Sequence, residues 1–164
     1  MIQLPPFSTS KVLADKALER SVSKTTVLWA QELVALGYES INLYELAGES
    51  EPYDQIEIEL LLDKVLKELG LVVTDKSSTI SHYIYMLVKR NLHEPKVYSD
   101  VLNEIKEISL ESNFPNLYYQ MFYSLYYAKI ELEYSDVQWY VRDANKGNID
   151  SIILEYFQYF IYNY

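Results

Sequence analysis

The stretch from Leu117 to Leu132 constrains the fold of this chain more than any other part of the sequence. It reads LYYQMFYSLYYAKIEL, without the clean alternation of a half-buried strand. At about 100° of rotation per residue, two apolar stripes run along one helix. The first contains Leu117, Met121, Leu125, Ala128 and Leu132, with Tyr118 and Phe122 beside it; the second contains Tyr119, Tyr123, Tyr126 and Ile130, with Tyr127 at its edge. A helix that is apolar nearly all round is one that other elements surround.

The alternative for this stretch is a buried β-strand over residues 118–127, because tyrosine and phenylalanine also favour strands. The unbroken length argues for a helix instead, and so does Pro115, which stands where a helix would start. The sequence therefore predicts a central Tyr-rich helix near residues 115–134, with the other elements packed around it.

Apolar periodicity along the rest of the chain predicts about eight helices with short connections, so the expected fold class is all-α. Asp54 with Glu57, and Ser135 with Gln138, have the spacing of capping boxes and predict two helix starts. Asn148 is a plausible cap for the last helix. The four glycines all fall at expected helix ends and are Gly37, Gly48, Gly70 and Gly147.

The length of 164 residues predicts a single compact domain. Because Pro5 and Pro6 oppose a helix start, we expect an irregular arm over residues 1–9 and one helical domain over residues 10–164. The absence of cysteine excludes disulfides and thiolate chemistry and fits a cytoplasmic protein. We expect no signal peptide and no membrane span, since no apolar run reaches about 18 residues.

Residues with catalytic potential are few. His82 and His93 would lie about 16 Å apart along one helix, too far to share a metal. No glycine-rich phosphate motif and no zinc-protease motif occurs. Two carboxylate pairs have neighbouring lysines and are interpreted as solvated; they are Glu59 with Asp63 and Glu104 with Glu107. We therefore expect no metal, no cofactor and no enzymatic activity, with an enzyme that has a dispersed carboxylate site as the least supported alternative.

Negative charge is concentrated in one window of the sequence. The net charge is −10, and residues 39–63 contain eight acidic side chains but no lysine or arginine. Binding to nucleic acid or to anionic membranes depends on basic side chains, so we expect neither. A solvated face that keeps the protein soluble is the plainest interpretation of the window, and a surface that steers a basic protein partner is the functional one.

Tyrosines beside these acids favour the functional interpretation, because tyrosine is enriched at protein interfaces. We predict that this surface binds a basic protein partner, which the acids attract and the tyrosines anchor. The predicted binding residues are Tyr44, Glu45, Glu49, Glu51, Tyr53, Asp54, Glu57 and Glu59. An immunity-type inhibitor of a toxin is one concrete version of this prediction. Under it, reversing Glu51 and Asp54 to lysine slows association.

A second hypothesis is a structural or scaffold domain that forms a homo-oligomer. Ile56 and Leu60 fall on the charged side of an amphipathic helix, where a neighbour must cover them or they form a contact surface. A homodimer that is insensitive to salt would favour this hypothesis over the electrostatic one.

Overall fold

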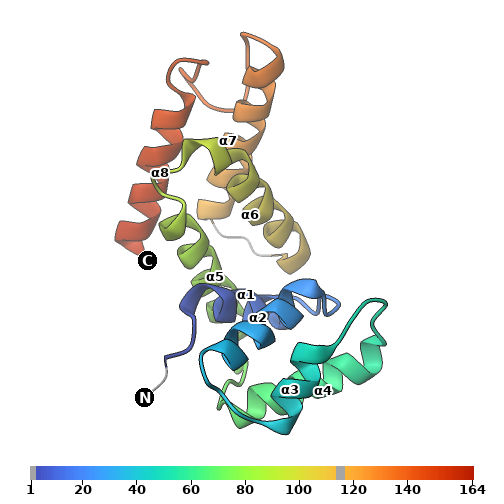
Figure 1. The fold of residues 1–164 in the computed structure, drawn as a ribbon. Helices are drawn as coiled ribbons and strands as arrows, with labels where there is room; N and C mark the ends of the chain where they lie inside the picture. The colour runs from blue at the N-terminus through green and yellow to red at the C-terminus, as the bar shows by residue number, and fades with distance from the viewer. Residues whose placement is uncertain (1–2, 114–116) are drawn as a thin grey trace. The chain divides into compact units, whose positions relative to one another are not determined.

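The computed structural model describes residues 3–113 and 117–164, and within them it contains eight α-helices, one 3₁₀ helix and no strand (Figure 1). This confirms the predicted all-α class. The helices are α1 Pro6–Ala17, α2 Lys24–Ala35, α3 Ile41–Gly48, α4 Gln55–Glu68, α5 Lys76–Arg90, η1 Pro95–Val97, α6 Tyr98–Ser112, α7 Leu117–Tyr134 and α8 Ile149–Asn163.

The chain divides into two compact units, Met1–Tyr83 and Ile84–Tyr164, and the boundary falls within α5. We refer to them as the N-terminal and C-terminal units. The single domain expected over residues 10–164 stays a prediction. Of the expected irregular arm over residues 1–9, residues 3–5 are non-helical and α1 already begins at Pro6. A proline suits the first helical position, because its missing N–H would have no partner there.

Side-chain caps start α3 and α4 in the N-terminal unit. Ser40 Oγ accepts a hydrogen bond from the Leu43 N–H at 2.9 Å. One carboxylate oxygen of Asp54 accepts from the N–H groups of Ile56 and Glu57 at 3.0 and 3.1 Å. Each cap satisfies backbone donors that a helix start leaves open, which is why these boundaries are local properties of the sequence.

The core of the N-terminal unit lies between α1, α2, α3 and α4, and Trp29 of α2 is its largest buried side chain. The Trp29 indole Nε1 donates to Thr9 Oγ1 of α1 at 3.0 Å, so the polar atom of the ring is satisfied inside the core. Asn42 near the start of α3 donates to Glu68 at the end of α4. The two helices therefore pack antiparallel.

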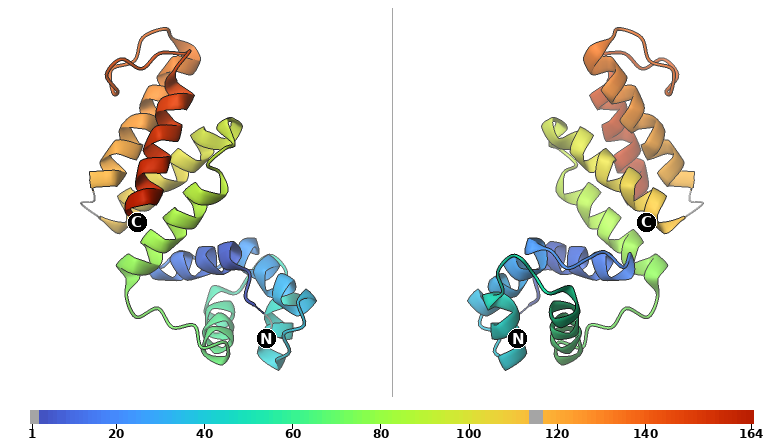
Figure 2. Two further views of the ribbon diagram at one scale, coloured as in Figure 1. Left: turned by 90° about the vertical axis from the view of Figure 1, so that its left-hand side faces the viewer. Right: turned by 90° about the vertical axis from the view of Figure 1, so that its right-hand side faces the viewer.

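Three helices of the C-terminal unit pack as antiparallel neighbours. Ser99 at the start of α6 donates to Glu133 near the end of α7 at 3.3 Å. Lys129 Nζ, late in α7, lies 2.8 Å from Asp150 Oδ1, early in α8. Figure 2 shows α7 and α8, orange and red, side by side in both views.

The predicted Tyr-rich helix is confirmed as α7, but it is buried on one face only, whereas its apolar pattern predicted burial nearly all round. Met121 is half-buried and Tyr123 is 39% exposed, whereas Tyr119 and Phe122 are buried. The α7 side chains that are buried are Tyr119, Phe122, Leu125, Ala128 and Leu132. The helix packs against α6 and α8 within its own unit. Pro115 and the side chain of Leu117 lie outside the described residues.

The helix start predicted at Ser135 is wrong, because residues 135–148 form a non-helical connection. Ser135 Oγ does accept from the Val137 N–H at 3.1 Å. The side-chain amide oxygen of Gln138, however, accepts from the N–H groups of Tyr140 and Val141, both at 2.8 Å. The Gln138 side chain therefore provides an acceptor for N–H groups of the loop that follows it. The bond from a capping-box side chain back to the Ser135 N–H is absent from this described segment.

Burial of Tyr98 predicts a loss of stability in alkaline solution. Its hydroxyl donates to the Leu92 carbonyl at 2.7 Å, and burial, reinforced by the charges of Asp150 and Glu94, raises the pKa of Tyr98. A raised pKa in the folded state gives stability that is complete below the unfolded value of about 10 and is lost as the pH rises through the folded value. We expect the free energy of unfolding, measured in urea, to begin to fall near the unfolded pKa of about 10 and to fall further as the pH rises above it.

The matched variant for this pH effect is Tyr98→Phe. It loses one hydrogen bond, worth about 1 kcal/mol at the pH values where the Tyr98 hydroxyl is protonated. Its alkaline decline should also be shallower than that of the wild type, because the ionising group is gone. Parallel declines in the two proteins would show that Tyr98 does not carry the effect.

Candidate functional site

The eight residues predicted to bind a partner follow one another from α3 into α4 (Figure 1). Tyr44 and Glu45 lie on α3, Glu57 and Glu59 lie on α4, and the other four lie in the connection between these helices. All are exposed except Tyr53, which is half-buried. The structure therefore presents most of the predicted site to solvent.

Tyr53 lies close enough to Glu49 and Glu51 for their charges to act on its phenol, and its ring also packs against the core of the N-terminal unit. Burial raises the pKa of the Tyr53 phenol, and the negative charges of Glu51 and Glu49 raise it further. Part of this ring therefore anchors the connection to its own unit. Tyr44, at 49% exposed, presents more of its ring to solvent.

Glu59 lies apart from the other acids. It is two residues after Glu57, so the two side chains point about 200° apart around α4. Glu59 lines a cavity together with residues of α1, whereas Asp54 is occupied as the cap of α4. Residues 44–57, which we call the acidic segment, follow one another along the chain from α3 into the first turn of α4, and Glu59 points away from Glu57.

Most carboxylates of this region have no cation beside them. Within the described residues, Asp63 pairs with Lys16 at 2.7 Å. The acids of residues 39–63 without an ion pair to a described residue are Glu39, Glu45, Glu49, Glu51, Asp54, Glu57 and Glu59. Their charge is therefore directed to solvent.

Large apolar side chains stand among these acids. Ile56 and Leu60, one turn apart on α4, are 75% and 58% exposed, so of the two alternatives that their position left open, no described neighbour covers them. Ile41, three residues before Tyr44 on α3, is 76% exposed and was not predicted. The i, i+3 spacing of Ile41 and Tyr44 was the signal that could have indicated it.

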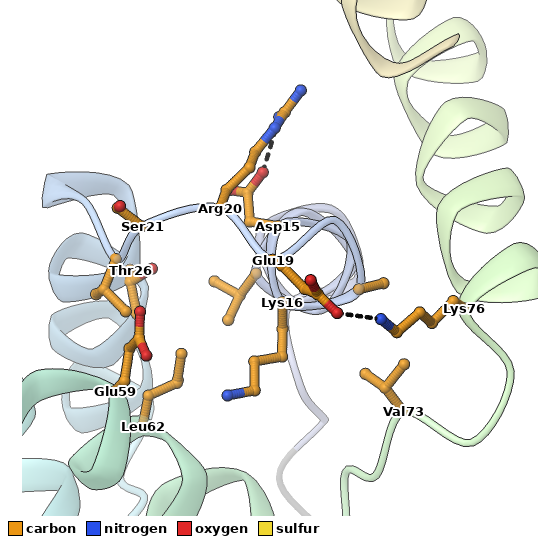
Figure 3. A pocket seen from close by; sticks show the side chains of 13 residues that line it. Asp15, Lys16, Glu19, Arg20, Ser21, Thr26, Glu59, Leu62, Val73 and Lys76 are labelled. Carbon is orange, nitrogen blue, oxygen red and sulfur yellow. Dashed lines mark hydrogen bonds and ion pairs between the residues drawn. The ribbon is translucent and has the colours of Figure 1, made fainter. Parts of the chain in front are cut away.

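A cavity of about 350 Å³ in the N-terminal unit lies beside α1 (Figure 3). Its three basic side chains each have an acidic partner, in the pairs Lys16 with Asp63, Arg20 with Asp15 and Lys76 with Glu19. The bond from Lys76 lowers the pKa of Glu19. No histidine is among the described residues that line the cavity. In each of these pairs the acid neutralises the base.

The described parts of the chain contain no group of three His, Cys, Asp or Glu side chains arranged to hold a metal ion. They also contain no helix with the length and apolar character needed to cross a bilayer.

Comparisons with protein-family models, with curated proteins and with solved structures find no match to this chain.

Proposed function

We propose that this chain is a non-enzymatic interaction protein whose acidic segment binds a basic protein partner. The observation that carries the proposal is a run of exposed carboxylates without ion pairs to described residues, alongside the half-exposed ring of Tyr44. An immunity-type inhibitor of a basic toxin is one form that this function would take.

Under this proposal, two physical effects contribute to binding, one through the association rate and one through the dissociation rate. The carboxylates attract a cationic surface over a distance of about one Debye length and raise the association rate. Tyr44, with the exposed Ile41 beside it on α3, supplies apolar and aromatic contact that lowers the dissociation rate. Complementary charge thus determines which partner binds, and the contact with the Tyr44 ring slows its dissociation.

The double variant Glu45→Lys/Glu51→Lys tests the steering role. We expect it to bind a 20-residue polylysine peptide with an association rate about tenfold lower than that of the wild type at low salt. The difference should shrink as salt is added. Surface plasmon resonance with immobilised peptide measures both rates. Asp54 is left intact because it caps α4, and its replacement would also change stability.

A control of equal charge is Glu94→Lys/Glu155→Lys, which reverses two exposed acids of the C-terminal unit. Both double variants change the net charge by the same amount. The proposal requires a clearly smaller loss of association rate in the control. Equal losses would mean that net charge alone governs association, and wild-type binding that ignores salt would also contradict the steering mechanism.

The exposure of Ile56 and Leu60 favours a second candidate function, self-association as a scaffold. Light scattering after size exclusion distinguishes the two. A dimer at micromolar concentration that persists in high salt and is lost in Ile56→Ser/Leu60→Ser supports the scaffold, whereas a monomer leaves the acidic segment as the better candidate.

A further inference from the structure

A second surface with recognisable chemistry lies in the C-terminal unit, where α7 runs into the connection over residues 135–148. It is a groove of about 570 Å³ lined by Ile130, Glu131, Tyr134, Ser135, Val137 and Trp139. None of these residues belongs to the acidic segment. The groove therefore defines a site of its own.

The aromatic side chains of the groove are unusually open to solvent. Tyr134 and Trp139 are each 85% exposed, and Val137 is 53% exposed. The other tryptophan, Trp29, is 1% exposed. Water contact of this extent is unfavourable for apolar rings, and clustered exposure of this kind marks interaction sites. Tryptophan and tyrosine are also the residues that most often dominate binding energy.

Polar contacts hold the backbone that presents Trp139. Its N–H donates to Glu131 Oε2 of α7 at 3.2 Å. The next two N–H groups are taken by Gln138, and Lys146 pairs with Asp136 at 2.9 Å across the connection. The ring is thus presented by an organised backbone, which lowers the entropy lost when a ligand binds.

The charge of the groove is negative. Glu131 is the only charged side chain among the described residues that line it. The cations of the same connection lie beside acids of their own, Lys146 beside Asp136 and Arg142 within 3.8 Å of Asp143. Aromatic faces are also negative in their electrostatic quadrupole. A carboxylate next to exposed Trp and Tyr faces is the combination that holds an organic cation.

We propose that this groove binds a lysine or arginine side chain of a basic peptide. The aliphatic stem lies against Ile130 and Val137, and the charged group lies over the Trp139 ring near Glu131. A neutral apolar guest would fill the groove but leave the carboxylate without a partner. An anionic guest would be repelled by it.

Three capped pentapeptides of glycine and serine test this, with arginine, lysine or norleucine at the centre. ¹H–¹⁵N NMR follows the two tryptophan indole N–H signals, with buried Trp29 as the internal reference. We expect the Trp139 signal to shift with the arginine and lysine peptides, at dissociation constants in the millimolar range typical of a single side chain. Norleucine should bind at least about tenfold more weakly, because it lacks the charge.

The decisive variant is Glu131→Gln, whose amide oxygen can still accept from the Trp139 N–H while the charge is lost. We expect affinity for the arginine peptide to fall at least about fivefold, with the Trp139 signal in the folded range. Glu133→Gln, which changes a nearby acid outside the groove, should bind as the wild type does. Equal affinity for norleucine, or an unchanged Glu131→Gln, overturns the proposal. So does a Trp139 shift with phosphatidylcholine vesicles but with neither cationic peptide.

Discussion

Replacing Trp29 with alanine is expected to lower the free energy of unfolding by about 3–5 kcal/mol, as for other large aromatic side chains removed from a core. Trp29 is 1% exposed, and its indole donates to the buried Thr9 hydroxyl. The variant therefore leaves a cavity and removes a buried hydrogen bond at once. Urea unfolding followed by circular dichroism measures the change. A loss of this size is a large fraction of the total stability of an ordinary domain.

The chain supplies its own control in the second tryptophan. Trp139→Ala removes an equally large side chain that is 85% exposed, so its effect should stay within about 0.5 kcal/mol. Trp29→Phe keeps most of the apolar volume but leaves Thr9 without its donor, and an intermediate loss of about 1–3 kcal/mol is expected. Similar effects of Trp29→Ala and Trp139→Ala would show that burial does not decide the stability of this unit.

Helix starts were predictable from the sequence where a single side chain caps the helix. Ser40 and Asp54 each cap the helix that directly follows, so their effect depends on neighbours only three residues away. Ser135 and Gln138 have the same spacing without the same result. There the Gln138 side chain bonds to the backbone of residues 140, 141 and 144, a loop geometry that no pattern of four residues specifies.

The buried face of α7 was harder to predict than the helix itself. With apolar side chains on nearly every side, the 3.6-residue period does not distinguish one inward face from another. Contacts with other helices decide between them. Phe122 meets Phe157 and Phe160 of α8 at ring-centre distances of 5.7 and 5.4 Å, which draws the face containing Phe122 inward.

In the candidate sites, too, some features follow from the local sequence and others depend on the tertiary structure. Exposure of the acidic segment followed from charge density alone. The separation of Glu59 from Glu57 follows from helix rotation, once α4 is known to continue through both residues. The groove at Trp139 was missed because residues 135–147 were expected to be helical. Its sequence signal was Tyr134, Val137, Trp139 and Tyr140 close together in an otherwise polar stretch.

Replacing Phe157 of α8 with alanine is expected to cause the second large loss in the free energy of unfolding, because its ring contacts other aromatic rings. Phe157 is fully buried, and its ring makes edge-to-face contacts with Tyr98 of α6 and Phe122 of α7 at 5.2 and 5.7 Å. We expect Phe157→Ala to cost about 3–5 kcal/mol in urea unfolding.

Phe157→Leu separates the two contributions to this loss. It retains most of the buried volume and removes the ring geometry, so it should cost only about 0.5–1.5 kcal/mol for each aromatic pair that it breaks. Tyr159→Ala is the matched control on the same helix, because that ring is 58% exposed. If Phe157→Leu destabilised as much as Phe157→Ala, ring geometry and not volume would dominate. If Tyr159→Ala matched Phe157→Ala, the packing of α8 against α6 and α7 would differ from the one described. Phe157 joins three helices of the C-terminal unit through one ring, and for that reason its removal affects them together.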